Sequence, residues 1–317
     1  MSVKSLSRKF RSKGPDGVDN VVPRIAVFPK CYIEDIAVTR TMSLFDWIEM
    51  SAQLQAEGLE MYAGFLQSYE EDYLRQVKEA VERIGLCVPM FCCSPDFTNP
   101  DSATRTAEMS LQRKNMKAAA FLGCETCRVL SGQRHPEVPL EEGIRHVVSA
   151  IKELLPLARR LGIKLAMENH YKDGAWRYPE FAQKKDVFLR IVRSISDPSF
   201  GVQYDPSNAI VAGDDPLELL EEVKDRIISM HASDRYLLPG HSLEELAQSS
   251  GDLGYSPILK HGEVGKGLNN YERIFSILTE INYQGWISVE DGEEGMEQMK
   301  RSVEYLKKLR SKYRNQH

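Results

Sequence analysis

The chain has 317 residues, of which 42% are hydrophobic and 27% charged, and its formal net charge at pH 7 is −5. These proportions are typical of a folded globular protein, and the acidic balance argues against a nucleic-acid partner, which usually leaves a basic surface. No apolar run approaches the roughly 20 residues of a membrane span, so we expect no membrane association.

Residues 1–22 are predicted to form a basic arm, and residues 23–317 a single domain. The arm has no apolar signal-peptide core, so we expect it to be disordered or to dock on a partner. Six cysteines without a secretory signal predict reduced thiols and a cytoplasmic location. Cys124 and Cys127 have the spacing of a redox motif but precede a strand instead of opening a helix, which argues against a redox or zinc role.

Short β-rich runs alternate with longer amphipathic runs along the chain. Strands are predicted where a brief apolar run is bounded by Gly, Pro or Asp, at residues 24–28, 58–62, 86–92, 126–130, 164–168, 200–205, 227–231 and 286–290. Helices are predicted where apolar residues recur every three or four positions, at residues 43–54, 69–84, 102–122, 140–161, 184–195, 216–223, 271–281 and 296–312.

Eight strands that alternate with eight helices imply parallel strands joined by crossover helices. Closing this series gives an α/β fold of the (β/α)8 TIM-barrel type, in which catalytic groups lie at the C-terminal ends of the strands. An open doubly wound sheet is the alternative, but it would need a Gly-rich fingerprint after the first strand, and none follows Phe28. We therefore predict the barrel.

The last four predicted strands each end on a residue that can bind a divalent metal: Glu168, Asp205, His231 and Glu290. Taken singly, each has an ordinary explanation as a loop acid, a helix cap or a core histidine. Taken together, they should converge on one rim of the barrel. Three carboxylates and one imidazole suit a hard or borderline cation, and we expect Mn²⁺, with Mg²⁺, Co²⁺ or Zn²⁺ as alternatives.

These strand ends carry a family resemblance. The motifs are MENH at 167–170, YDPSN at 204–208, MHASDR at 230–235, HGEVGKG at 261–267 and GWISVE at 285–290. With them, the chain resembles the xylose isomerase-like TIM-barrel superfamily from about residue 24 to residue 309, in its branch of sugar isomerases and epimerases. The motifs are specific for the superfamily and only weakly informative about the substrate.

The resemblance implies that Glu168, Asp205, His231 and Glu290 hold one divalent metal. It also implies that the two glutamates face each other across a sugar and exchange protons with carbon, through an enediolate that the metal stabilises. Arg235 matches an arginine that contacts the substrate in the family. Several family epimerases have a His where this chain has Asn208, which weakens an assignment to the ketose 3-epimerases; we place Asn208 among the substrate-binding candidates.

Two further histidines lie near the expected barrel mouth. His135 follows the fourth predicted strand and is a candidate catalytic acid or base, because imidazole titrates near neutral pH; a hydrogen-bonding role in its loop is the alternative. His170, two residues after Glu168, is a weaker candidate, which we assign to substrate binding. Lys30, Glu60 and Trp176 are further candidates for the pocket wall.

A long, mostly polar stretch at about residues 235–262 is interpreted as a lid or partner-contact loop, with a surface insertion as the alternative. The leading functional hypothesis is a metal-dependent sugar isomerase or epimerase with a small-molecule substrate, acting as an oligomer. A lyase that cleaves 3-oxo-C-glycosides, similar to the α subunit of C-glycoside deglycosidases and working with a second subunit, is the main alternative. An endonuclease IV-like nuclease is disfavoured by the seven histidines and the acidic charge, and a non-catalytic scaffold barrel is the remaining possibility.

Overall fold

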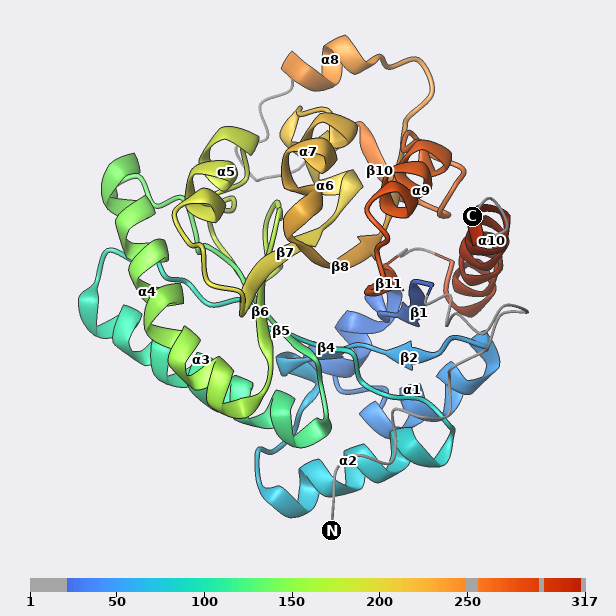
Figure 1. Ribbon diagram of the computed structural model, residues 1–317, viewed down its shortest axis with the longest axis horizontal. Helices are drawn as coiled ribbons and strands as arrows, with labels where there is room; N and C mark the ends of the chain where they lie inside the picture. Colours follow the sequence, from blue (N-terminus) through green and yellow to red (C-terminus); the bar gives the residue numbers. More distant parts are fainter. Residues whose placement is uncertain (1–21, 249–255, 291–293, 315–317) are drawn as a thin grey trace.

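The computed structural model describes residues 22–248, 256–290 and 294–314, and helices surround a central ring of strands (Figure 1). The basic arm predicted at residues 1–22 lies outside this part of the chain except for Val22, so it stays a prediction. Among the described residues, no helix is both long and apolar enough to cross a membrane.

A nine-stranded sheet forms the barrel, in the order β2-β1-β11-β8-β7-β6-β5-β4-β3, and all its neighbouring strands are parallel. The strands are β1 (Arg24–Val27), β2 (Gly58–Leu59), β3 (Met61–Tyr62), β4 (Met90–Cys92), β5 (Thr126–Val129), β6 (Lys164–Glu168), β7 (Phe200–Tyr204), β8 (Ile227–Ala232) and β11 (Trp286–Val289). β2 and β3 are two pieces of one strand, separated only by Glu60, so the ring has eight strand positions. The predicted (β/α)8 barrel is confirmed.

All eight predicted helices are present, and they surround the ring of strands. They are α1 (Leu44–Ser51), α2 (Glu71–Arg83), α3 (Ser102–Leu122), α4 (Leu140–Leu161), α5 (Lys185–Arg193), α7 (Pro216–Val223), α9 (Tyr271–Glu280) and α10 (Met296–Arg314). α4 shows why they form: Val147, Ile151 and Leu154 recur on one face and are fully buried. The helix ends at Gly162, whose φ of 71° is a left-handed conformation that glycine adopts without strain.

Two of the predicted strands differ from the observed ones. The strand predicted at 86–92 is continuous only from Met90 onward, as β4, and before it Cys87 forms a single isolated bridge with Gly58. Pro89 has no N–H to donate, although its carbonyl accepts from Glu125 and Thr126. The strand predicted at 58–62 is interrupted at Glu60, whose side chain is fully buried.

The segment predicted as a loop at about 235–262 is structured at both ends. β9 (Asp234–Leu237) and β10 (Leu259–Gly262) form an antiparallel hairpin of their own, separate from the barrel sheet. Between them, the described residues include the short helix α8 (Leu243–Gln248), which Figure 1 shows at the outer edge of the molecule. A small apolar cluster of Ile210, Leu246 and Leu259 packs the segment from β9 to β10 against α6 (Pro206–Ala212).

Candidate active site and metal centre

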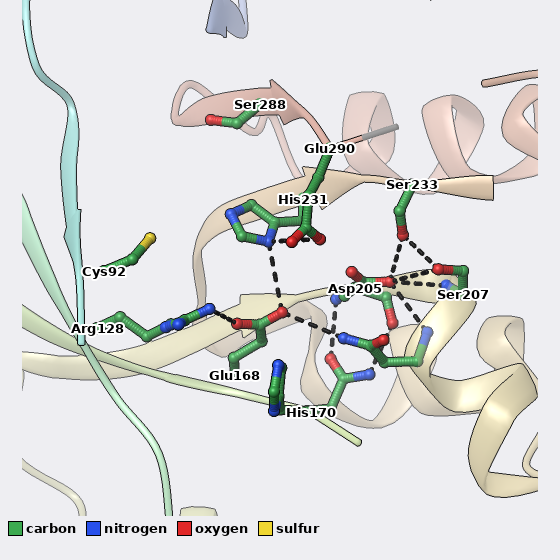
Figure 2. Close-up of polar contacts among 12 residues, drawn as sticks. Cys92, Arg128, Glu168, His170, Asp205, Ser207, His231, Ser233, Ser288 and Glu290 are labelled. Atoms are coloured by element: carbon green, nitrogen blue, oxygen red, sulfur yellow. Dashed lines mark hydrogen bonds and ion pairs between the residues drawn. The ribbon is translucent and has the colours of Figure 1, made fainter. Parts of the chain in front are cut away.

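The four strand ends bring the predicted metal ligands together (Figure 2). One ligand atom from each of Glu168, Asp205, His231 and Glu290 lies within 4.8 Å of the others, and all four residues are buried. Glu168 ends β6, Asp205 follows β7, His231 lies in β8 and Glu290 follows β11. These four strands are neighbours in the sheet, which is why residues far apart in sequence share one end of the barrel.

Two buried atoms at the centre of this cluster make no well-formed hydrogen bond within the described part of the chain. They are Nδ1 of His231 and Oδ2 of Asp205. Nδ1 of His231 lies 3.4 Å from Oε1 of Glu168 and 3.2 Å from Oε2 of Glu290. Unpaired buried polar atoms are costly, and so are carboxylates crowded together. A divalent cation would relieve both costs, and three oxygens with one imidazole nitrogen suit it.

Asp205 is oriented by the helix that follows it. Its Oδ1 atom accepts hydrogen bonds from the backbone N–H of Ser207 at 2.8 Å and of Asn208 at 3.0 Å, so Asp205 caps the N-terminus of α6. The hydroxyl of Ser233 donates to the same oxygen at 2.7 Å. The cap fixes the carboxylate and leaves Oδ2 for a metal. Burial and the negative charges of Glu290 and Glu168 raise the pKa of Asp205 to about 6.

Glu168 is held by a cation that sequence reasoning missed. Nη1 of Arg128, a buried residue of β5, donates to Oε2 of Glu168 at 2.6 Å, and Nε of Arg128 donates to the carbonyl of Cys93 at 3.2 Å. Burial opposes ionisation of Glu168, but the charges of Arg128 and His231 outweigh it and lower the pKa of Glu168 to about 2. The signal that could have revealed this pair is an arginine in the middle of an otherwise apolar strand.

Glu290 has a cationic neighbour of its own. Nζ of Lys30 lies 3.2 Å from Oε1 of Glu290. Burial again opposes ionisation, but the charges of Lys30 and His231 hold the pKa of Glu290 well below its usual value. Lys30 was expected in the pocket wall, and the structure places it beside a predicted metal ligand.

The second nitrogen of His231 faces Glu60. Nε2 of His231 lies 2.8 Å from Oε2 of Glu60, and a hydrogen bond in which this nitrogen donates to the carboxylate fits the contact. Glu60 also accepts from the hydroxyl of Ser288 and from Sγ of Cys92, the latter at 3.3 Å. Glu60 lies in the gap between β2 and β3. It leaves Nδ1 of His231 as the nitrogen that faces the other ligands.

Comparison with known proteins shows the family to which the chain belongs. Residues 45–309 match the family model described as "Xylose isomerase-like TIM barrel". The chain belongs to this family. The L-ribulose-5-phosphate 3-epimerase UlaE of Shigella boydii is 24% identical over 260 residues, which cover 81% of this chain and 80% of that protein.

Solved structures of the xylose isomerase-like barrel share the fold. A D-tagatose 3-epimerase-like protein superimposes with a TM-score of 0.71 and 19% identity, over 92% of this chain and 99% of that one. The 3-keto-D-glucoside 4-epimerase YcjR from E. coli superimposes with a TM-score of 0.66 and 16% identity, over 91% of this chain and 99% of that one. At these identities the structural likeness shows the fold alone.

The residues predicted to bind substrate in this xylose isomerase-like barrel lie around the ligand cluster. Nδ2 of Asn208 donates to Oε1 of Glu168 at 3.2 Å. His170 lies beside Glu168 in Figure 2, and its Nδ1 atom is 3.4 Å from Oε2 of Glu180. The third predicted residue, Arg235, lies on β9 with Cζ 5.0 Å from the ring centre of Tyr171.

His135, the third predicted catalytic residue, has different neighbours. Its Nε2 atom lies 2.8 Å from Oδ2 of Asp96, and its ring meets that of Tyr178 edge-on at 5.3 Å. Asp96 is held in turn by the backbone N–H and side-chain amide of Gln133, at 2.9 and 3.0 Å. Among the described residues, none of the contacts found for His135 is with a metal ligand. Its catalytic role therefore stays a prediction.

Proposed function

We propose that this protein is a divalent-metal-dependent enzyme that isomerises or epimerises a sugar by moving a proton on a carbon next to a carbonyl group. The observation that carries the proposal is the buried cluster of four potential ligands, in which Oδ2 of Asp205 makes no hydrogen bond to the described residues and Nδ1 of His231 faces the carboxylates of Glu168 and Glu290. A scaffold barrel would have no need of such a costly arrangement. The similarity to UlaE supports a sugar as the substrate.

Glu168, Asp205, His231 and Glu290 would hold the cation. When bound, a divalent cation would polarise a substrate carbonyl and an adjacent hydroxyl, which makes the neighbouring C–H more acidic. Mn²⁺ is the proposed ion, with Mg²⁺, Co²⁺ and Zn²⁺ as alternatives that the same donor set accepts.

Glu168 and Glu290 are the proposed proton carriers. β7 and β8 separate their strands in the sheet, so the two carboxylates enter the site from different sides. One can receive the proton from carbon while the other returns a proton to the opposite face. Arg128 and Lys30 keep the two groups ionised in the substrate-free protein, so either can accept the proton from carbon. The group that returns a proton must first take one up from water. Asn208 and His170 are placed to orient the sugar.

The test is proton exchange at carbon. The Mn²⁺-loaded protein is incubated with ketohexoses in D₂O, and deuterium uptake and sugar interconversion are followed by mass spectrometry and chromatography. We expect uptake next to the carbonyl, and a loss of at least about a hundredfold in Glu168→Gln and Glu290→Gln. Glu82→Gln, on the exposed face of α2, is the matched control and should keep full activity.

The same proton abstraction would also begin a lyase reaction, so 3-oxo-C-glycosides form a second arm of the experiment. Release of free aglycone only from these compounds would replace the isomerase proposal by the lyase one. The absence of exchange with every substrate, despite bound metal, would refute both.

A further inference from the structure

The rim of the metal centre carries a buried cation without a counter-charge. Arg235 is only 3% exposed, and its Nε and Nη2 atoms are buried without a hydrogen-bond partner in the described part of the chain. A guanidinium cannot lose its charge in a protein, so burial of unpaired donors is costly unless a ligand completes the site. The hydrogen-bonding capacity of Arg235 is therefore available to a bound molecule.

Arg235 is held rigidly by its hairpin. The carboxylate of Asp234 accepts backbone hydrogen bonds from Arg235 at 2.9 Å, Gly265 at 3.0 Å, Gly267 at 2.9 Å and Asn269 at 3.1 Å. These bonds fasten the hairpin to the loop that follows β10. The bonds fix the backbone at Arg235, and burial of its side chain beside the ring of Tyr171 limits the motion of the guanidinium, so less freedom is lost when it binds a planar anion.

His261 lies across the hairpin from Arg235. The two residues are paired in the register of β9 and β10, and Nδ1 of His261 is also buried without a partner. Burial and the positive charges of Lys30 and Arg235 lower the pKa of His261 far below its usual value, so its ring is neutral. A neutral imidazole can donate a hydrogen bond to an anion without adding a third charge.

Lys30 completes the group. Its Nζ atom lies 5.7 Å from the ring centre of Tyr171, and Cζ of Arg235 lies 5.0 Å from the same ring centre. Both cations are therefore neighbours of the Tyr171 ring. The ion-pair partner of Lys30 is Glu290, at 3.2 Å. If Glu290 binds a divalent cation, its negative charge is shared with that ion, and Lys30 is left without a full counter-charge.

We propose that Arg235, Lys30 and His261 form a subsite for an anionic oxygen group of the substrate, a carboxylate or a phosphate, close to the reacting carbon. The guanidinium fork matches either group in a two-point contact, and Lys30 adds a second charge. The short distance from Lys30 to Glu290 places the subsite beside the metal centre. The inference rests on the proposed function and narrows its substrate from sugars in general to acidic sugar derivatives.

Binding to the full-length, Mn²⁺-loaded protein tests this subsite. The probes are D-gluconate, inorganic phosphate and the neutral polyol sorbitol, titrated by calorimetry into the wild type, Lys30→Met, Arg235→Met and Lys260→Met. Lys260 is an exposed lysine next to His261 on β10, so its variant removes an equal charge outside the subsite. Metal content and thermal unfolding are measured for each variant, which separates loss of the subsite from loss of the metal or the fold.

We expect gluconate, phosphate or both to bind at least about tenfold more tightly than sorbitol, a preference lost in Lys30→Met and Arg235→Met and kept in Lys260→Met. Preference for gluconate identifies a carboxylate, and preference for phosphate identifies a phosphate. Equal affinity for all three probes would overturn the inference, and so would equal losses in Lys30→Met and Lys260→Met.

The two proposals fail separately. Turnover of neutral ketohexoses by a protein with no preference for anions would refute the subsite and leave the proposed function standing. Anion binding that depends on Lys30, without proton exchange on any sugar, would retain the subsite and refute the function.

Discussion

Nε2 of His231 lies 2.8 Å from Oε2 of Glu60, and both side chains are fully buried. This pair decides which nitrogen of His231 faces the metal ligands. Glu60→Gln should weaken Mn²⁺ binding by about 10- to 100-fold, because loss of a buried carboxylate partner of a ligand histidine has effects of this size. Competition with a chelator measures the affinity. An unchanged affinity would show that Glu60 has no part in orienting His231; Glu79→Gln, on the exposed face of α2, is the control.

The ion pair between Arg128 and Glu168 should have a different effect in the presence and absence of metal. Arg128→Met leaves Glu168 buried without its cation, so the free energy of unfolding of the metal-free protein should fall by about 3–5 kcal/mol. Bound Mn²⁺ should reduce this loss, because the ion supplies the missing positive charge. Urea denaturation with and without Mn²⁺ measures both values. A loss of the same size in the two conditions would contradict this explanation.

Metal binding should depend on pH through Asp205. Because the pKa of Asp205 is raised to about 6 in the metal-free protein, its carboxyl is protonated below that pH and must release the proton to bind a cation. The affinity for Mn²⁺ should therefore fall as the pH decreases below about 6 and change little through this group above it. Titrations between pH 5 and pH 8 check the direction. An affinity that is constant across this range would be inconsistent with a role for Asp205 as a ligand.

The cysteines should divide into two classes. Cys92, Cys93, Cys124 and Cys127 are buried, whereas Cys87 is exposed and Cys31 is partly exposed. Treatment of the folded protein with iodoacetamide should therefore modify Cys31 and Cys87 before the four buried cysteines, as read by mass spectrometry. Cys87 should react slowly for an exposed thiol, because desolvation raises its pKa to about 11. Rapid labelling of Cys124 or Cys127 would reopen a redox role for that pair.

The cluster of four potential metal ligands could be predicted from sequence because parallel strands of a barrel end on the same rim. Glu168, Asp205, His231 and Glu290 each end or follow a short apolar run, and no detail of packing was needed to bring them together. The prediction of the cluster used only the order of the strands and the polarity of the residue at each strand end. The barrel fold could be predicted from the same alternation of strands and helices.

The contacts that support the cluster could not be found in this way, although Glu60 and Lys30 were among the candidates for the pocket wall. Whether Arg128 faces Glu168 depends on the register of β5 against β6, and the contact between Glu60 and His231 crosses the barrel between residues 171 positions apart. The β9–β10 hairpin joins strands separated by a long polar stretch, so sequence periodicity alone gave no reason to pair them. The position of His135 depends on its loop, where Asp96 fixes the ring.

The independence of the β9–β10 hairpin from the barrel sheet has a consequence for specificity. Its two strands pair only with each other in the described part of the chain, while the four proposed ligands lie on or directly after barrel strands. Replacement of this hairpin would change the residues that are proposed to bind the substrate, while the four proposed metal ligands would stay on the barrel strands. Chimeras that swap this hairpin would therefore test whether it sets the specificity of the proposed enzyme.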